Sequence, residues 1–258
     1  LNLLLKLKII FKNVIYTLKY INTNVILPKK NFFYNRIILT WAFEQNFNKD
    51  GSLNDKYFNL NSKDLKDTLW LVIYMGQKLP KKLSHNIFLI KQNQKISLNL
   101  FKIFGVLFKN FIYFFINIKY YLALISSDNY FADIIIDKFN FLFNEKVKTF
   151  LIPYEGQVFQ NKLIYSLKQR KKIKVIGYVH SPPMAMPSNF IHRSGSPDIV
   201  VLNSIDQKHC FKNYLGWKNE QIKILPSFRF TKNRKRFKNT IFLPISVLDP
   251  VPLLKILD

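Results

Sequence analysis

Between residues 149 and 203, short apolar runs alternate with polar stretches, and this alternation constrains the fold more than any other feature. The runs TFLIPY (149–154), KVIGYV (174–179) and PDIVVLN (197–203) are rich in β-branched and aromatic residues. Each run stops at polar, Gly or Pro residues, as strands do. An amphipathic stretch at 157–170 separates the first two runs. The pattern predicts βαβ units, and hence an α/β fold with a parallel sheet.

Similar patterns predict more strands and helices elsewhere in the chain. Apolar runs predict strands at 36–43, 69–75, 86–90 and 221–227, although 69–75 is also compatible with a helix. Helices are expected at 97–124, 128–144 and 204–215, with a short one following Ser62. Ser204 and Gln207 have the spacing of a capping box, and Gly216 suits the end of the same helix. These elements predict a Rossmann-like domain over residues 35–227.

Polar residues follow two of the predicted parallel strands, at the edge where such sheets bind ligands. Glu155, Gly156 and Gln157 follow the strand at 149–154. A carboxylate beside a flexible glycine suits a general base or a hydroxyl-binding group, and the amide of Gln157 would face the same crevice. His180 and Ser181 follow the next strand, where a histidine could take a proton or bind a phosphate or sugar oxygen. The alternatives are structural, because Glu155 could favour the following helix electrostatically and His180 could serve the core.

Two other loops supply further candidates. Asn46 and Asp50 lie in the long loop after the first strand, which is where a doubly wound fold builds its site. The alternative for Asp50 is ordinary turn chemistry with Gly51. Ser227 and Arg229 end the last strand, where an arginine could neutralise a diphosphate.

The charge and composition restrict the possible partners. The chain carries 40 Lys and Arg against 15 Asp and Glu, a formal net charge of +25. Such an excess favours anionic partners, although the spread of Lys among Asn, Ile and Phe is also typical of compositional drift in an AT-rich genome. The basic run at 228–239 belongs to no known nucleic-acid module, so we expect no nucleic-acid partner and interpret the run as a linker.

Other features bear on metal, compartment and membrane. The single cysteine, Cys210, excludes an internal disulfide and any site with several cysteine ligands, and it suits a reducing compartment. No spacing groups the histidines with carboxylates, so we expect no metal. No uncharged run reaches the roughly 20 residues of a membrane span. Residues 1–34 are basic and amphipathic, which suits a docked surface helix or contact with an anionic membrane.

The ends of the sequence suggest a piece of a longer protein. The chain begins with Leu and stops in what resembles the first turns of a helix. Residues 240–258 have the pattern of one strand and the start of one helix. We therefore expect them to open a second Rossmann-like domain.

The run IPYEGQVFQNKLIYSLKQ, the later pieces GYVHS and PDIVVLNS, and the earlier TWAFEQNF together resemble a family of bacterial surface-polysaccharide biosynthesis proteins. These are similar to glycosyltransferases of the GT-B type. The resemblance spans about residues 35–250 and implies two Rossmann-like domains with a cleft between them. The acceptor would bind on residues 35–227 and the nucleotide sugar on the domain that begins at 240. Glu155 would be the base and His180 a phosphate or acceptor contact.

The resemblance implies sugar transfer from a nucleotide donor to a glycan or lipid-linked glycan, without a bound metal or other cofactor. The expected location is the cytoplasm, at the inner face of the membrane. One alternative is a nucleotide-sugar epimerase of the same architecture. Another is a non-catalytic carbohydrate-binding protein or the fragment of a decayed gene.

Overall fold

The computed structural model describes most of the predicted Rossmann-like domain. It covers residues 33–91, 127–139, 145–171, 173–180 and 187–228, with residues 24–26 and isolated positions between 8 and 15, between 104 and 112, and at 142. The predicted helix at 97–124 therefore lies almost wholly outside the described residues. The linker at 228–239 and the second domain at 240–258 lie outside them from residue 229 onward.

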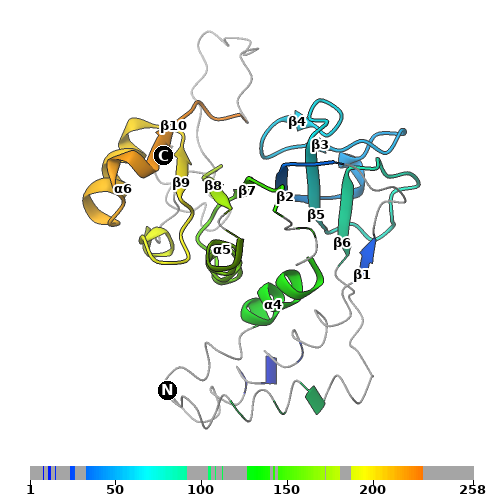
Figure 1. Cartoon of the computed structure of the whole chain (residues 1–258), viewed down its shortest axis with the longest axis horizontal. Coiled ribbons are helices and arrows are strands. Elements are labelled where there is room, and N and C mark those ends of the chain that lie inside the picture. The colour runs from blue at the N-terminus through cyan, green and yellow to red at the C-terminus, as the bar shows by residue number, and fades with distance from the viewer. Residues whose placement is uncertain are drawn as a thin grey trace, which may run out of the picture.

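The described strands form an eight-stranded sheet in the order β1-β6-β5-β2-β7-β8-β9-β10 (Figure 1). All neighbouring pairs are parallel except β1 and β6. This confirms the α/β class and the parallel sheet. The strands are β1 (Asn24–Ile26), β2 (Arg36–Ala42), β5 (Thr68–Tyr74), β6 (Ile87–Lys91), β7 (Thr149–Pro153), β8 (Lys174–Tyr178), β9 (Ile199–Leu202) and β10 (Ile222–Ile224).

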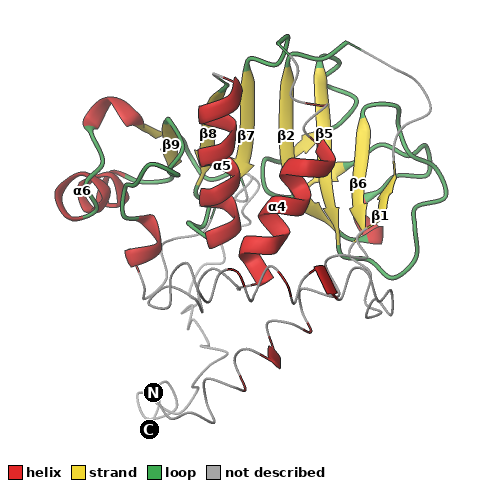
Figure 2. Ribbon diagram, turned by 60° about the horizontal axis from the view of Figure 1, so that its bottom comes forward, coloured by secondary structure: helices red, strands yellow, loops and turns green. Residues whose placement is uncertain are grey.

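One face of the sheet is covered by helices. Figure 2 shows α4 (Ser127–Phe139) and α5 (Val158–Lys171) lying across it, with α6 (Ile205–Tyr214) beside β9. A hydrophobic core lies between the sheet and these helices. Phe159, Leu163 and Leu167 of α5 are buried in this core, at the four-residue spacing of one helical face. They meet alternate residues of the strands, such as Phe150. The hydrophobic periodicity of the sequence thus matches the packing.

The opposite face is covered by the β2–β5 loop, which we define as residues 43–67. It contains a short 3-10 helix η1 (Glu44–Asn46) and the hairpin of β3 (Asn54–Asp55) and β4 (Leu60–Asn61). Leu53 and Phe58 of the loop are buried in a second core with Trp70 and Tyr178. A loop without a long helix therefore replaces the helix that commonly covers a sheet at this place.

Several local predictions can be compared with the structure. The predicted helix after Ser62 is wrong, because those residues form turns and Ser62 Oγ accepts a hydrogen bond from Leu53 N at 2.9 Å. At the start of α6, Ser204 Oγ accepts a hydrogen bond from Gln207 N at 3.2 Å, which confirms that Ser204 caps the N-terminus of this helix. Gly216 has φ +75°, as the end of that helix requires. Strand β1 was not predicted. Among the elements whose bounds the structure describes, two further short 3-10 helices are η3 (Pro187–Phe190) and η4 (Asn219–Gln221).

Candidate active site

The strand order creates a switch point between β2 and β7. After β2 the chain turns to the face covered by the β2–β5 loop, and after β7 it turns to the helical face through α5. In open α/β sheets, ligands bind at the carboxyl ends of the strands where the connections diverge in this way. We call residues 154–157, which join β7 to α5, the β7–α5 turn. It and the β2–β5 loop form the two sides of this edge.

Glu155 and His180 are brought together at this edge. His180 Nε2 lies 3.2 Å from Glu155 Oε1. Gln157 Nε2 donates to the other carboxylate oxygen, Glu155 Oε2, at 2.7 Å. The side chain of Glu155 is 44% exposed and that of His180 only 5%. A substrate can therefore reach the carboxylate from solvent, while the imidazole supports it from within.

The shape of the β7–α5 turn follows from two residues. Gly156 has φ +67°, and a Cβ there would come within 2.1 Å of the carbonyl oxygen of Asn189. Glycine is needed at this position because any side chain would be both strained and in collision. Gln160 Oε1 accepts from the backbone N–H groups of Glu155 and Gln157, and its Nε2 donates to Pro153 O. The sequence analysis missed Gln160, and its place in the first turn of the helix was the available signal.

His180 is enclosed by the second core. The ring of Tyr57 meets the imidazole edge-on, with 4.7 Å between ring centres. The Nε2 atom of the imidazole lies 3.2 Å from the Glu155 carboxylate, which can only accept hydrogen bonds while it is ionised. His180 Nδ1 is buried and has no hydrogen-bond partner within the described part of the chain. The contacts fix the orientation of the ring toward Glu155.

Asp55 is a further site residue that the sequence analysis missed. Its carboxylate is buried and accepts hydrogen bonds from the Thr40 hydroxyl and, at 2.5 Å, from Phe58 N. Burial raises the pKa of Asp55, against the lowering effects of these hydrogen bonds and of His180. No local pattern marks Asp55, because its role depends on the contact with Thr40 and on burial within the folded loop.

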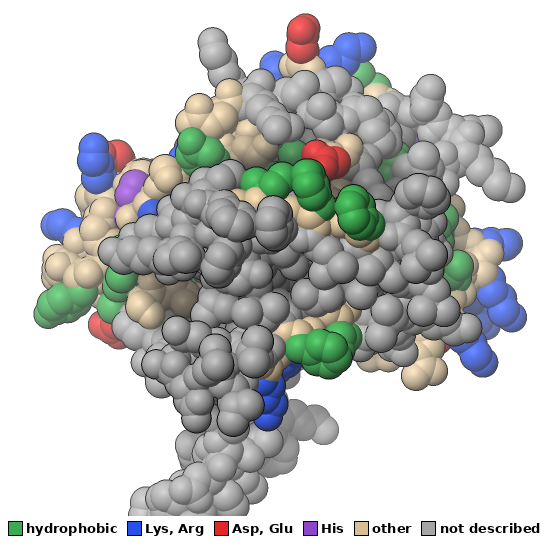
Figure 3. Space-filling view, turned by 90° about the horizontal axis from the view of Figure 1, so that it is seen from below, with side chains coloured by type: hydrophobic (Ala, Val, Ile, Leu, Met, Phe, Trp, Pro, Cys, Tyr) green, Lys and Arg blue, Asp and Glu red, His purple; other side chains and the backbone are tan. Residues whose placement is uncertain are grey.

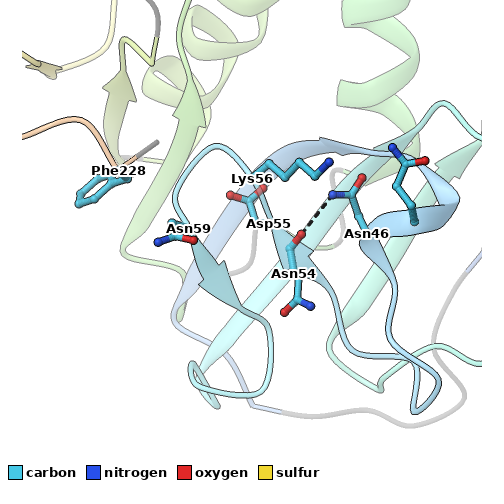
Figure 4. A pocket seen from close by; sticks show the side chains of 7 residues that line it. Asn46, Asn54, Asp55, Lys56, Asn59 and Phe228 are labelled. Carbon is cyan, nitrogen blue, oxygen red and sulfur yellow. Dashed lines mark hydrogen bonds between the residues drawn. The ribbon is translucent and has the colours of Figure 1, made fainter. Parts of the chain in front are cut away.

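A cavity of about 620 Å³ lies beside this cluster. Figure 4 shows Phe228 on one side of it and Asn46 and Asn54 on the other, with Asp55 and Asn59 between them. Its size is in the range of small-molecule sites. The lining residues come from the β2–β5 loop and from the segment after β10: Gln45, Asn46, Asn54, Asp55, Lys56, Asn59 and Phe228.

The remaining predicted site residues fall in different places. Asn46 lines the cavity, where its side chain accepts from Phe43 N and donates to Asn54 O. Asp50 does not line it; its carboxylate holds its own turn through Ser52 and pairs with Lys63. Ser227 precedes Phe228 and is partly buried. Ser181 and Arg229 lie outside the described residues.

The described residues also bear on the expectations for metal, charge and membrane. Among them, no group of three or more His, Cys, Asp or Glu could hold a metal ion. The described Lys and Arg side chains visible in Figure 3 stand in separate groups along the edge of that face. Within the same part of the chain, no helix has the length and apolar character needed to cross a membrane.

Comparisons with known proteins add a fold likeness and no family. No model of a known protein family matches the chain, and no curated protein matches its sequence. Among solved structures, the chain is similar to a sucrose-phosphate synthase from Thermosynechococcus elongatus, with a TM-score of 0.40 and 9% sequence identity. The match covers 76% of this chain and 90% of that one. We draw no functional argument from a likeness at this level, and the resemblance to surface-polysaccharide proteins remains a prediction.

Proposed function

We propose that this chain activates the acceptor hydroxyl in a glycosyltransferase of cell-surface polysaccharide or lipopolysaccharide synthesis. The donor would be a nucleotide sugar and the acceptor a glycan or lipid-linked glycan. We place the reaction in the cytoplasm, at the inner face of the membrane where lipid-linked acceptors sit. No metal or other cofactor is part of the proposed chemistry.

The observation that carries the proposal is the accessible carboxylate of Glu155 at the switch point, held by a buried histidine. Gln157 donates to one of its oxygens and His180 Nε2 lies 3.2 Å from the other, so the carboxylate is oriented before a substrate arrives. Pre-orientation of this kind lowers the entropic cost of reaching a reactive geometry. A carboxylate is also a suitable general base for a sugar hydroxyl.

In the proposed reaction, Glu155 takes the proton of the acceptor hydroxyl while the hydroxyl oxygen forms a bond to the anomeric carbon of the donor sugar. The bond from that carbon to the nucleotide phosphate breaks, and the phosphate oxygen leaves with the electron pair. His180 keeps the Glu155 carboxylate in place through Nε2, and the proton later passes from Glu155 to water.

The proposal is tested by following release of the nucleotide from a panel of UDP-, GDP-, ADP- and dTDP-sugars in the presence of lipid-linked glycans. Glu155→Gln keeps the size of the side chain and removes the base, so turnover is expected to fall by about 100-fold or more. Glu220→Gln, at an exposed glutamate of η4, is the matched control and should keep full turnover.

Two results would contradict the proposal. Equal turnover in wild type and Glu155→Gln would show that Glu155 is not the general base. Conversion of a nucleotide sugar to its epimer, with no lasting release of nucleotide, would show that the protein is an epimerase of the same architecture and that it does not transfer sugar.

A further inference from the structure

The cavity lined by Asp55 has two unlike walls. One wall is polar and comes from the β2–β5 loop; the other is the ring of Phe228, which follows β10. The two walls are about 170 positions apart in the sequence, and they meet because the segment after β10 returns to β8. Phe228 N donates to the hydroxyl of Tyr178 at 3.2 Å, and the two rings lie 5.2 Å apart.

The polar wall divides into fixed and available groups. The amides of Asn46 and Asn54 are held by hydrogen bonds to neighbouring loop residues, so they stiffen the wall. Within the described part of the chain, no hydrogen bond or ion pair holds the side chains of Gln45, Lys56 or Asn59. Their donors and acceptors can therefore turn to a ligand at little cost to the fold.

The apolar wall is a single aromatic face. Phe228 is 38% exposed although its backbone and one side of its ring are held by Tyr178. Its position is therefore set by packing while part of its ring remains accessible. An aromatic ring fixed opposite amide groups suits a ligand with one apolar face and a polar edge.

The charges of the lining select among such ligands. Lys56 is the one basic residue of the lining, and a single lysine does not balance the charges of a diphosphate. A nucleoside diphosphate would bring at least two negative charges close to the buried Asp55 carboxyl. A neutral sugar ring brings none, presents a C–H face to Phe228 and places hydroxyls toward Gln45 and Asn59.

We propose that this cavity binds a neutral carbohydrate ring that stacks on Phe228 and forms hydrogen bonds through its hydroxyls with Gln45 and Asn59. The inference rests on the proposed function, since it names the part of the acceptor glycan that docks next to the base. The link to the base is structural: Asp55 lines the cavity, and Tyr57, two residues later, contacts His180. A ring held here positions a neighbouring hydroxyl for Glu155.

Saturation-transfer NMR with maltose, cellobiose and lactose, without any nucleotide, tests the cavity directly. We expect binding of at least one disaccharide in the millimolar range, with signal concentrated on the ring C–H protons. Phe228→Ala should weaken that binding about tenfold or more, and Phe228→Tyr should retain it because the ring face is kept. Tyr214→Ala removes an exposed aromatic that does not line the cavity and is the matched control.

The possible outcomes distinguish failure of the carbohydrate site from failure of Glu155 as the base. No disaccharide binding, or binding unchanged in both Phe228→Ala and the double variant Gln45→Ala/Asn59→Ala, would overturn the inference. Binding of UDP, GDP or ADP that is lost in Phe228→Ala would also overturn it, in favour of a nucleotide site. If disaccharides bind through Phe228 but Glu155→Gln keeps full turnover, the cavity stands and the proposed base fails. Melting temperatures of all variants show that each is folded.

Discussion

The β7–α5 turn and the β2–β5 loop form the two sides of one edge, yet they are held in different ways. The backbone of the four-residue turn is held by the side chain of Gln160, which is three to five residues further along the chain, although Gly156 also packs against Asn189. The loop is fixed by contacts across longer separations, such as Thr40 to Asp55 and Asn86 to Ser62. The backbone that carries Glu155 is therefore held largely by a nearby side chain, whereas the loop that lines the cavity depends on residues outside the loop.

The largest expected effect tests the tightness of the β7–α5 turn. Gly156→Ala places a Cβ against Asn189 at a positive φ, so we expect a loss of roughly 2–5 kcal/mol in the free energy of unfolding. Gly105→Ala is the control, because a Cβ there meets nothing within 4 Å. It should change stability by no more than about 1 kcal/mol. Urea denaturation measures both, and equal values would show that the turn is not tightly packed.

The next effect tests the buried support of the β2–β5 loop. Asp55→Ala leaves Phe58 N and the Thr40 hydroxyl without their acceptor, at a cost of about 1–3 kcal/mol. We expect the same variant to lower disaccharide binding, because the cavity wall loosens. A variant as stable as wild type would show that the loop is held without this carboxyl.

The pH dependence of stability, compared between wild type and Asp55→Asn, tests whether the Asp55 carboxyl is buried. Burial raises the pKa of Asp55, so the folded state favours the protonated carboxyl. Its stabilising contribution is full below the ordinary pKa of aspartate and is lost as the pH rises through the raised folded-state pKa. Wild type should therefore lose stability relative to Asp55→Asn with rising pH. Thermal unfolding at a series of pH values measures this, and parallel curves would contradict the burial argument.

A smaller effect is expected from the partner of Glu155 within the turn. Gln157→Ala removes the amide that donates to Glu155 Oε2, and the loss of one such bond predicts a fall of about 2- to 10-fold in turnover. Gln77→Ala, at an exposed glutamine in another loop, should leave turnover unchanged. A fall as large as that of Glu155→Gln would mean that the amide does more than orient the carboxylate.

The smallest effect concerns the outer end of the β2–β5 loop. Lys63 and the Ser52 hydrogen bonds hold the pKa of Asp50 far below its ordinary value, but both partners of the ion pair are well exposed. Solvent screens such pairs, so Lys63→Met should leave the melting temperature at pH 7 almost unchanged. Any difference should vanish as the pH falls through the range where Asp50 gains its proton. A large drop at pH 7 would make this pair a main support of the loop.

The sequence predicted one side of the site better than the other, for a physical reason. Strands β2, β5 to β10 and helices α4 to α6 follow from hydrophobic periodicity, and Glu155 and His180 follow from their positions after two strands. The structure brings these two residues into contact. The role of Asp55 depends on Thr40 and on burial by core aromatics, and that of Phe228 depends on Tyr178, which lies 50 residues away. Such partners are set by tertiary packing and leave no local pattern.

Chemical rescue of Glu155→Ala tests directly whether Glu155 is the general base. Sugar transfer by this variant is expected to fall about 100-fold or more and to be partly restored by added formate, which can enter the space of the missing carboxylate and take the proton. Formate should not stimulate wild type or Gln157→Ala. Transfer by Glu155→Ala at the wild-type rate, without formate, would contradict the claim that Glu155 is the base.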